Sequence, residues 1–169
     1  MGSHSLRRME PWPEPVERVA AVLREAQLEA RIEEFPAGTA SAEEAAAAVG
    51  CKPAQIVKSL VLMAGREAAV VLVPGDRRVD TAKIAAKLGV DKIRFAGADQ
   101  VRSLTGFEPG AVAPFPLPGV KHVLADRALL TQPELWVGAG SHTHLAALGP
   151  ADLMRLAGAI SMDAAERPG

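Results

Sequence analysis

Cysteine and aromatic residues are scarce in this chain. A single cysteine, Cys51, among 169 residues excludes an internal disulfide framework. A lone thiol of this kind is more often a packing residue than a nucleophile. With 4% aromatic residues and no tyrosine, the core must be built from alanine and branched aliphatic residues. Stacking platforms for unpaired bases are therefore not expected in number.

Long apolar runs are also missing, since no stretch approaches the ~20 residues that a membrane-spanning helix needs. We therefore expect a cytoplasmic protein with no membrane partner. The opening "MGSHSLRRM" lacks the apolar core of a signal peptide. Residues 1–13 are interpreted as a tag remnant or disordered N-terminus, residues 14–160 as a single domain and residues 161–169 as a loose tail.

The net charge of −1 conceals an uneven distribution along the chain. Residues 1–50 carry 5 basic and 9 acidic side chains, residues 51–127 carry 12 and 7, and residues 128–169 carry 2 and 4. The middle segment, at 12 − 7 = +5, suits an anionic ligand but falls short of the strongly basic surface of a protein that follows long nucleic acids. On charge alone, a cluster of basic residues on a solvated face is the favoured explanation.

Hydrophobic periodicity and capping residues predict an α/β (α+β) chain in which helices and strands interleave without strict alternation. Such an order favours a mixed, curled sheet with helices packed outside it. Helices are predicted at 14–30, 41–49, 80–89, 99–104 and 149–158. Strands are predicted at 31–35, 55–63, 68–74, 92–96, 121–125, 134–138 and 143–148, the second and third forming a hairpin.

Lys58 lies in the middle of the apolar strand "QIVKSLVLM". On a strand it shares a face with Ile56 and Leu60, while Ser59 points to the opposite face. A lysine here either extends its ammonium to water at the strand end or lies in a cleft as a functional group. The stretch alone does not separate these two interpretations.

Residues 105–119, "TGFEPGAVAPFPLPG", form a connection that is long for a compact domain. Glycine allows a backbone to approach a ligand closely, and proline restricts the local conformations. Such a loop can hold N–H donors in place for an anion or oxyanion. A merely rigid surface loop is the alternative.

His142 and His144 would project from one face if "SHTH" were a strand. A catalytic zinc site usually takes three protein ligands, and only the distant His122 is a candidate third ligand, so no metal or other cofactor is predicted. One histidine is better interpreted as a hydrogen-bonding or acid–base group and the other as structural. No serine lies in a G-x-S-x-G elbow, and no P-loop or dinucleotide fingerprint is present.

Four segments occur in a recognisable order: "T.S..EAA..VG....QIVKSLV", "GD.RVD..K.A..LG", "TGFEPGAVAPF" and "GAGSHTHL.....ADL". Together, over roughly residues 35–157, they resemble the YbaK family of editing domains, which includes the insertion domain of bacterial prolyl-tRNA synthetases. The resemblance implies a free-standing member with a mixed, barrel-like sheet surrounded by helices. It also implies hydrolysis of a wrong amino acid from the 3′ end of a mischarged tRNA.

The resemblance assigns catalytic roles to Lys58, to Gly110 at the start of a G-x-x-x-P loop, and to His142. The substrate-binding residues that we expect with them are Thr39, Ser59, Ala111, Val112, Ala113, Pro114, Ser141 and His144. Lys58 would be a positioning charge for a phosphate or ester oxygen, and its ammonium would emerge beside the 110–114 loop. "SHTH" is more similar to branches that act on small aminoacyl groups, which favours alanyl-tRNA(Pro) as substrate and prolyl-tRNA synthetase as an associated partner.

Two other functions stay open from the sequence. A non-catalytic module of the same fold would bind tRNA ends or a synthetase. A metal-dependent hydrolase would use His142 and His144. The intact Lys58 and "GAVAP" loop favour the deacylase over the binding module.

Overall fold

The computed structural model describes residues 11–167, and the predicted N-terminal segment 1–13 therefore lies mostly outside the described residues. Five α-helices occur in the described part of the chain: α2 Glu14–Glu25, α3 Ala42–Val49, α4 Thr81–Leu88, α5 Ala98–Thr105 and α6 Pro150–Ala157. The strands are β1 Ile32–Glu34, β2 Ile56–Ala64, β3 Glu67–Pro74, β4 Arg94–Phe95, β5 His122–Asp126, β6 Leu135–Ser141, β7 His144–Leu148 and β8 Ile160–Met162. No described helix is long and apolar enough to span a membrane.

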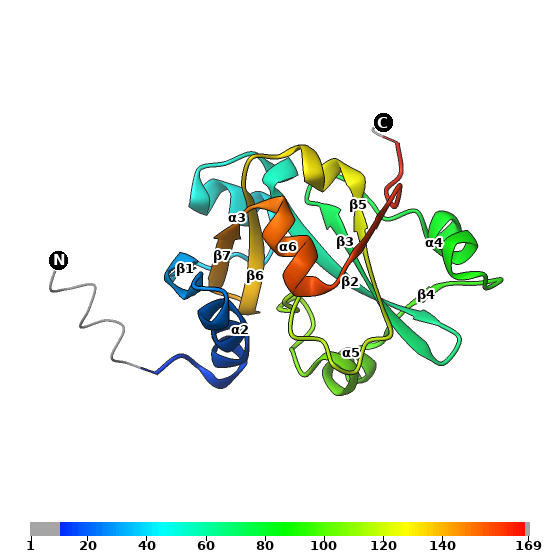
Figure 1. Ribbon diagram of the computed structural model, residues 1–169, viewed down its shortest axis with the longest axis horizontal. Helices are drawn as coiled ribbons and strands as arrows, with labels where there is room; N and C mark the ends of the chain where they lie inside the picture. The colour runs from blue at the N-terminus through cyan, green and yellow to red at the C-terminus, as the bar shows by residue number, and fades with distance from the viewer. Residues whose placement is uncertain (1–10, 168–169) are drawn as a thin grey trace, which may run out of the picture.

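All eight strands belong to one mixed sheet, which confirms the predicted fold class. The strand path runs β1-β7-β6-β2-β3-β5-β8, with β4 paired to β2 off this path. The β2–β3 hairpin is antiparallel, whereas β2–β6, β3–β5 and β5–β8 are parallel. Figure 1 shows the sheet strongly twisted, with α6 crossing in front of it and α2 beside β6, at the opposite end of the molecule from α4.

Local sequence sets the ends of the helices that frame the site. The Ser41 hydroxyl accepts a hydrogen bond from the Glu44 N–H at 3.0 Å and begins α3. Gly50 ends the same helix with φ +84°, a conformation that glycine adopts without penalty. Asp80 caps α4 in the same way, by accepting from the N–H groups of Ala82 and Lys83. These helix starts agree with the sequence predictions.

The first helix is shorter than predicted. α2 ends at Glu25 and not at residue 30, because the chain turns at Gln27, whose φ is +63°. A 3₁₀ turn, Glu29–Arg31, then leads into β1. The buried face of α2 keeps the predicted spacing, with Val16, Val19, Ala20 and Leu23 packed into the main core.

The predicted loose tail at 161–169 is wrong for its described part. Ile160–Met162 pairs in parallel with β5, and the buried Asp126 carboxylate accepts hydrogen bonds from the N–H groups of Ala164 and Ala165 at 2.8 and 3.1 Å. The Glu166 N–H also donates to the Arg78 carbonyl at 2.8 Å. These long-range bonds hold a segment in which a local pattern indicated no element.

Candidate functional site

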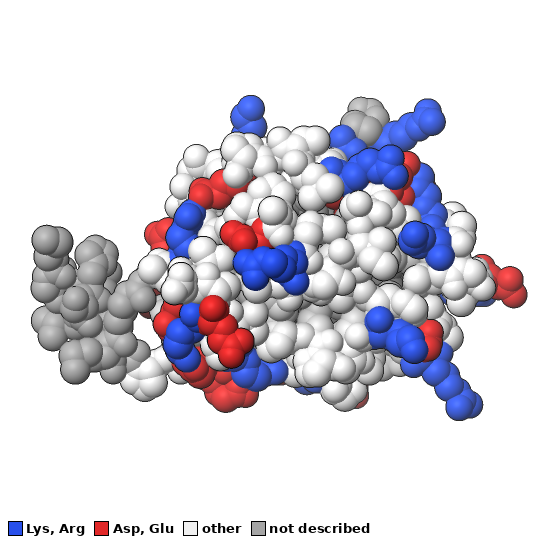
Figure 2. Space-filling model, viewed as in Figure 1, with Lys and Arg blue, Asp and Glu red and all other residues white. Residues whose placement is uncertain are grey.

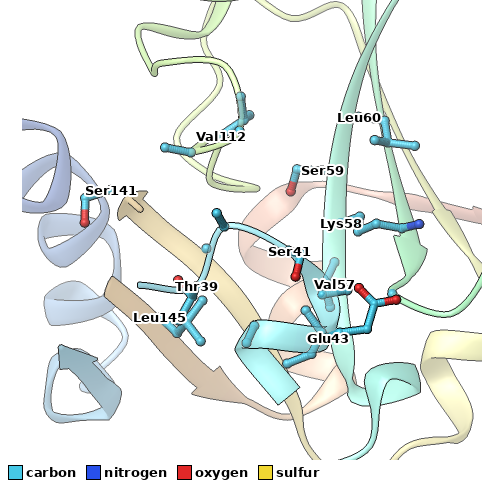
Figure 3. A pocket seen from close by; sticks show the side chains of 18 residues that line it. Thr39, Ser41, Glu43, Val57, Lys58, Ser59, Leu60, Val112, Ser141 and Leu145 are labelled. Carbon is cyan, nitrogen blue, oxygen red and sulfur yellow. The ribbon is translucent and has the colours of Figure 1, made fainter. Parts of the chain in front are cut away.

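A pocket of about 440 Å³ opens where the start of α3, the first half of β2, the 110–112 loop and the strands β6 and β7 converge (Figure 3). Seven of the sequence-predicted site residues line it: Thr39, Lys58, Ser59, Gly110, Ala111, Val112 and Ser141. Its other lining residues include Ser41, Glu43, Ala45, Ile56, Val57, Leu60, Gly75, Gly138 and Leu145. Four predicted residues, Ala113, Pro114, His142 and His144, do not line it.

Lys58 and Ser59 leave β2 on opposite sides. Figure 3 shows Ser59 on the side that faces Val112, and Lys58 on the other side together with Leu60. On the Ser59 side, the neighbouring Val57 and Val61 pack into the main core. The strand alternation that the sequence predicted therefore separates the two polar groups, although both reach the same pocket.

The Lys58 ammonium is held at the edge of the pocket by a backbone carbonyl. Its Nζ donates to the Arg77 carbonyl at 2.5 Å, in the turn that follows β3. Burial lowers the pKa of Lys58, the charges of Glu43 and Asp76 oppose this shift, and the charge of Arg78 adds to it. The sequence expectation placed this ammonium beside the 110–114 loop, whereas the carbonyl that accepts its hydrogen bond lies in the 75–79 turn.

Ser59 carries the one buried side-chain polar atom, among residues 11–167, that has no hydrogen-bond partner. Its hydroxyl interrupts an otherwise apolar strand face at the wall of the pocket. An unpaired buried hydroxyl costs ~1–3 kcal/mol of folding free energy. The Ser59 side chain thus lines the pocket with its hydroxyl oxygen buried in the wall.

The 106–119 loop is anchored in the core by several buried residues, although parts of it reach the surface. Phe107, Ala113 and Phe115 are 1%, 0% and 2% exposed, and Pro114 is buried too. Ala113 and Pro114 are therefore anchors, which is why they do not reach the pocket. Between the anchors, the Ala111 N–H donates to the Glu108 carbonyl at 2.9 Å and closes a turn. This packing fixes Gly110 and Val112 at the pocket wall.

Gly110 has a backbone conformation that a side chain would strain. Its φ is +82°, and a Cβ added there would lie 3.2 Å from Cε1 of His142. The loop thus approaches the β6–β7 turn closely at this point.

The two histidines do not share a face, contrary to the strand interpretation of "SHTH". His142 lies in the turn between β6 and β7 and is exposed, whereas His144 begins β7 and is 5% exposed. A bulge between Gly138 and Ser141 ends the regular pairing of the two strands. His144 Nδ1 lies 2.6 Å from the Ser141 hydroxyl, and burial lowers the pKa of His144, opposed by the charge of Glu34.

The segment before α3 is tied to the same turn. The N–H and the hydroxyl of Thr39 each donate to the His142 carbonyl at 2.9 Å. This contact brings Ser41 and Glu43, at the start of α3, to the pocket. Neither residue was among the predicted site residues, because only the pairing of 39 with 142 places them at the pocket.

Residues 11–167 contain no group of three or more histidine, cysteine, aspartate or glutamate side chains arranged to hold a metal ion. His122, the distant candidate ligand, instead lies 3.1 Å from the Glu67 carboxylate. Its side chain is thus placed on the β3–β5 pair, away from the pocket lining.

Comparison with known proteins identifies the family. The family model of the aminoacyl-tRNA editing domain matches residues 36–156. A proline–tRNA ligase of Nitratidesulfovibrio vulgaris (strain DP4) is 37% identical over 109 residues, which cover 64% of the chain and 19% of the ligase. A proline–tRNA ligase of Pelotomaculum thermopropionicum is 31% identical over 140 residues, covering 80% of the chain and 24% of the ligase.

The chain thus spans about a fifth of the length of these relatives. Among solved structures, one described as a "putative trans-editing enzyme for prolyl tRNA synthetase" superposes with a TM-score of 0.85 and 35% identity. That superposition covers 92% of this chain and 99% of the other. Because the family model matches most of its length, the chain belongs to the aminoacyl-tRNA editing domain family.

Proposed function

We propose that the protein hydrolyses the ester bond of a mischarged tRNA in trans, and that it removes alanine or another small amino acid from tRNA(Pro). The observation that carries the proposal is the pocket that joins Lys58, the Ser59 hydroxyl and the rigid Gly110–Val112 segment. Membership of the editing-domain family and similarity to proline–tRNA ligases support the same substrate class.

The chemistry needs little beyond positioning. An aminoacyl ester is already activated, so a protein accelerates its hydrolysis by placing water and by stabilising the negative charge that develops on the carbonyl oxygen. In this proposal the Lys58 ammonium leaves the Arg77 carbonyl, or shares it, to contact the terminal phosphate or the ester oxygen. A charged donor suits both the phosphate anion and the negative charge that develops on the ester carbonyl oxygen.

The aminoacyl side chain would lie against the apolar part of the lining, formed by Ala45, Val57, Val112 and Leu145. The Ser59 hydroxyl is the hydrogen-bonding group that this wall leaves unsatisfied. A pocket distinguishes amino acids by size, with about 1–3 kcal/mol for each methylene. Correctly charged prolyl-tRNA would then be spared because proline is larger than alanine.

The test is deacylation of a panel of tRNA(Pro) charged with alanine, serine, cysteine or proline. The proposal expects release of the small amino acids, little release of proline, and loss of activity in Lys58→Met. Lys52→Met, at an exposed lysine outside the pocket lining, is the matched control and should remain active. Tight binding of charged tRNA without any hydrolysis would instead favour a non-catalytic module.

A further inference from the structure

A half-buried cluster of hydrogen bonds at the pocket connects Ser141 to His144. The Ser141 hydroxyl lines the pocket and lies 2.6 Å from His144 Nδ1 and 3.2 Å from the Thr143 hydroxyl. It also accepts a hydrogen bond from the Thr143 N–H at 3.0 Å. Whether the Ser141 hydroxyl can donate or accept a hydrogen bond toward the pocket therefore depends on whether His144 Nδ1 accepts from it or donates to it.

Trp12, in the segment before α2, packs on the far side of this cluster. Its ring meets His144 edge-on, with ring centroids 5.8 Å apart and an interplanar angle of 87°. Trp12 Nε1 donates to the Glu29 carboxylate at 2.9 Å, which fixes the indole orientation. The family model begins at residue 36, so this contact comes from outside the matched segment.

The start of α2 supports the same wall at a second point. Gly140, in the β6 bulge, has φ +103°, and a Cβ added there would lie 2.6 Å from the Pro15 carbonyl oxygen. The backbone of the bulge thus lies directly on the first turn of the helix. Residues 12–16 therefore contact both the strand that presents Ser141 and the histidine bonded to it.

We propose that Trp12 is a positioning residue: it holds the His144 ring against Ser141 and excludes water from it, so that the Ser141 hydroxyl presents one fixed hydrogen-bonding direction to the substrate. The role of Ser141 toward substrate rests on the proposed function. The packing of Trp12 on His144 does not, and it is tested separately.

Protonation of His144 would reverse this direction. When the ring is neutral with its proton on Nε2, Nδ1 accepts from the Ser141 hydroxyl, and the serine oxygen faces the pocket as an acceptor. When the ring is charged, Nδ1 donates, and the serine hydrogen turns to other acceptors. The groups around the ring are the hydroxyls of Ser141 and Thr143, the Trp12 indole and the charge of Glu34 on β1.

Burial lowers the pKa of His144 and so favours the neutral ring, while Glu34 opposes it. Removing the indole would rehydrate the ring and let its pKa rise toward the ordinary value of 6.5. The acid limb of the activity profile would then move to higher pH, because the hydrogen bond reverses at a higher pH.

The experiment compares Trp12→Ala with Trp12→Phe, which keeps an aromatic edge. Val22→Ala removes a side chain that packs against the core from α2, the helix that follows Trp12, and it serves as the control for a general loss of packing. If Trp12→Ala does not fold, Trp12→Gln replaces the indole by a polar side chain that admits water to the ring. Titration of the His144 ring by NMR, without any tRNA, is the first measurement, and the pH profile of deacylation is the second.

We expect the His144 pKa to rise in Trp12→Ala or Trp12→Gln and to stay near its original value in Trp12→Phe and Val22→Ala. Because the His144 pKa would rise no further than its ordinary value of 6.5, deacylation by Trp12→Ala near pH 6 should fall by at most about fourfold, and the deficit would shrink toward about pH 8. A folded Trp12→Ala protein with an unchanged His144 titration overturns the proposal. If the unaltered protein hydrolyses no charged tRNA, the proposed function fails, while the NMR titration still decides the role of Trp12.

Discussion

Replacing Ser59 by alanine should make the protein more stable and less active. The Ser59 hydroxyl is buried at the pocket wall and has no hydrogen-bond partner within residues 11–167. Its strand neighbours Val57 and Val61 are 5% and 7% exposed and belong to the apolar core. A methyl group suits this face better than an unsatisfied hydroxyl, so the serine is retained at a cost to folding.

The size of the effect follows from that cost. Burying an unpaired hydroxyl costs ~1–3 kcal/mol, and the small void that alanine leaves offsets part of the gain. We therefore expect the free energy of unfolding to rise by about 1 kcal/mol. In a domain of this size, that rise corresponds to an increase in Tm of about 2–4 °C. Loss of one neutral hydrogen bond to substrate should lower kcat/KM about twofold to tenfold.

Urea unfolding and deacylation of alanyl-tRNA(Pro), measured on the same preparations, test both signs. Ser103→Ala is the matched control, because Ser103 is exposed on α5 outside the pocket lining and its loss should change stability by less than about 0.5 kcal/mol. A destabilised Ser59→Ala protein with unchanged kcat/KM would refute the reasoning, since the hydroxyl would then serve the fold and not the substrate.

Three further predictions concern the lysine, the loop and the buried histidine. Lys58→Met should abolish deacylation without lowering the Tm, because burial disfavours the ammonium. In the unaltered protein, deacylation should decline as pH rises through the pKa of Lys58, which burial lowers below the ordinary value of 10.5. Gly110→Ala and Gly65→Ala both place a side chain at positive φ, +82° and +64°, and each should lose about 1–2 kcal/mol of unfolding free energy. Only Gly110→Ala should lose activity as well, since Gly65 has nothing within 4 Å of an added Cβ whereas Gly110 faces the β6–β7 turn. Equal deacylation by the two glycine variants would contradict the role of the loop. Burial lowers the pKa of His144, so below about pH 6.5 the unfolded chain binds more protons than the folded one. The stability should therefore fall as pH falls through that range toward the pKa of His144 in the folded state. A flat Tm in His144→Gln across the same range, beside a sloping Tm in the unaltered protein, would identify the group.

Much of the fold could be predicted because its signals are local. The apolar, β-branched runs of β2 and β3 lie on either side of a short turn. Ser41 caps α3, and Asp80 caps α4. The predicted mixed sheet is confirmed. Its signal in the sequence was the order of helices and strands, which interleave without strict alternation. By contrast, β8 has no local signal and forms because β5 pairs with it.

The candidate site could be predicted only in part, because some of its geometry depends on distant contacts. Alternation along β2 predicted that Lys58 and Ser59 face opposite ways, but the Arg77 carbonyl that binds the ammonium was not visible in the sequence. Whether "SHTH" is a strand or a turn decides which histidine is buried, and the bulge in β6 settles it. Trp12 reaches His144 across more than a hundred residues, so no motif includes both.

The central claim is that this pocket hydrolyses a mischarged tRNA with Lys58 as its positioning charge. Single-turnover deacylation of alanyl-tRNA(Pro), followed side by side for the unaltered protein, Lys58→Met and Lys52→Met, tests it most directly. We expect release of alanine by the unaltered protein and Lys52→Met, and release at the spontaneous rate with Lys58→Met. Equal rates for all three proteins above the spontaneous rate would exclude Lys58 as the positioning charge, and no release above it by any of them would exclude hydrolysis in this pocket.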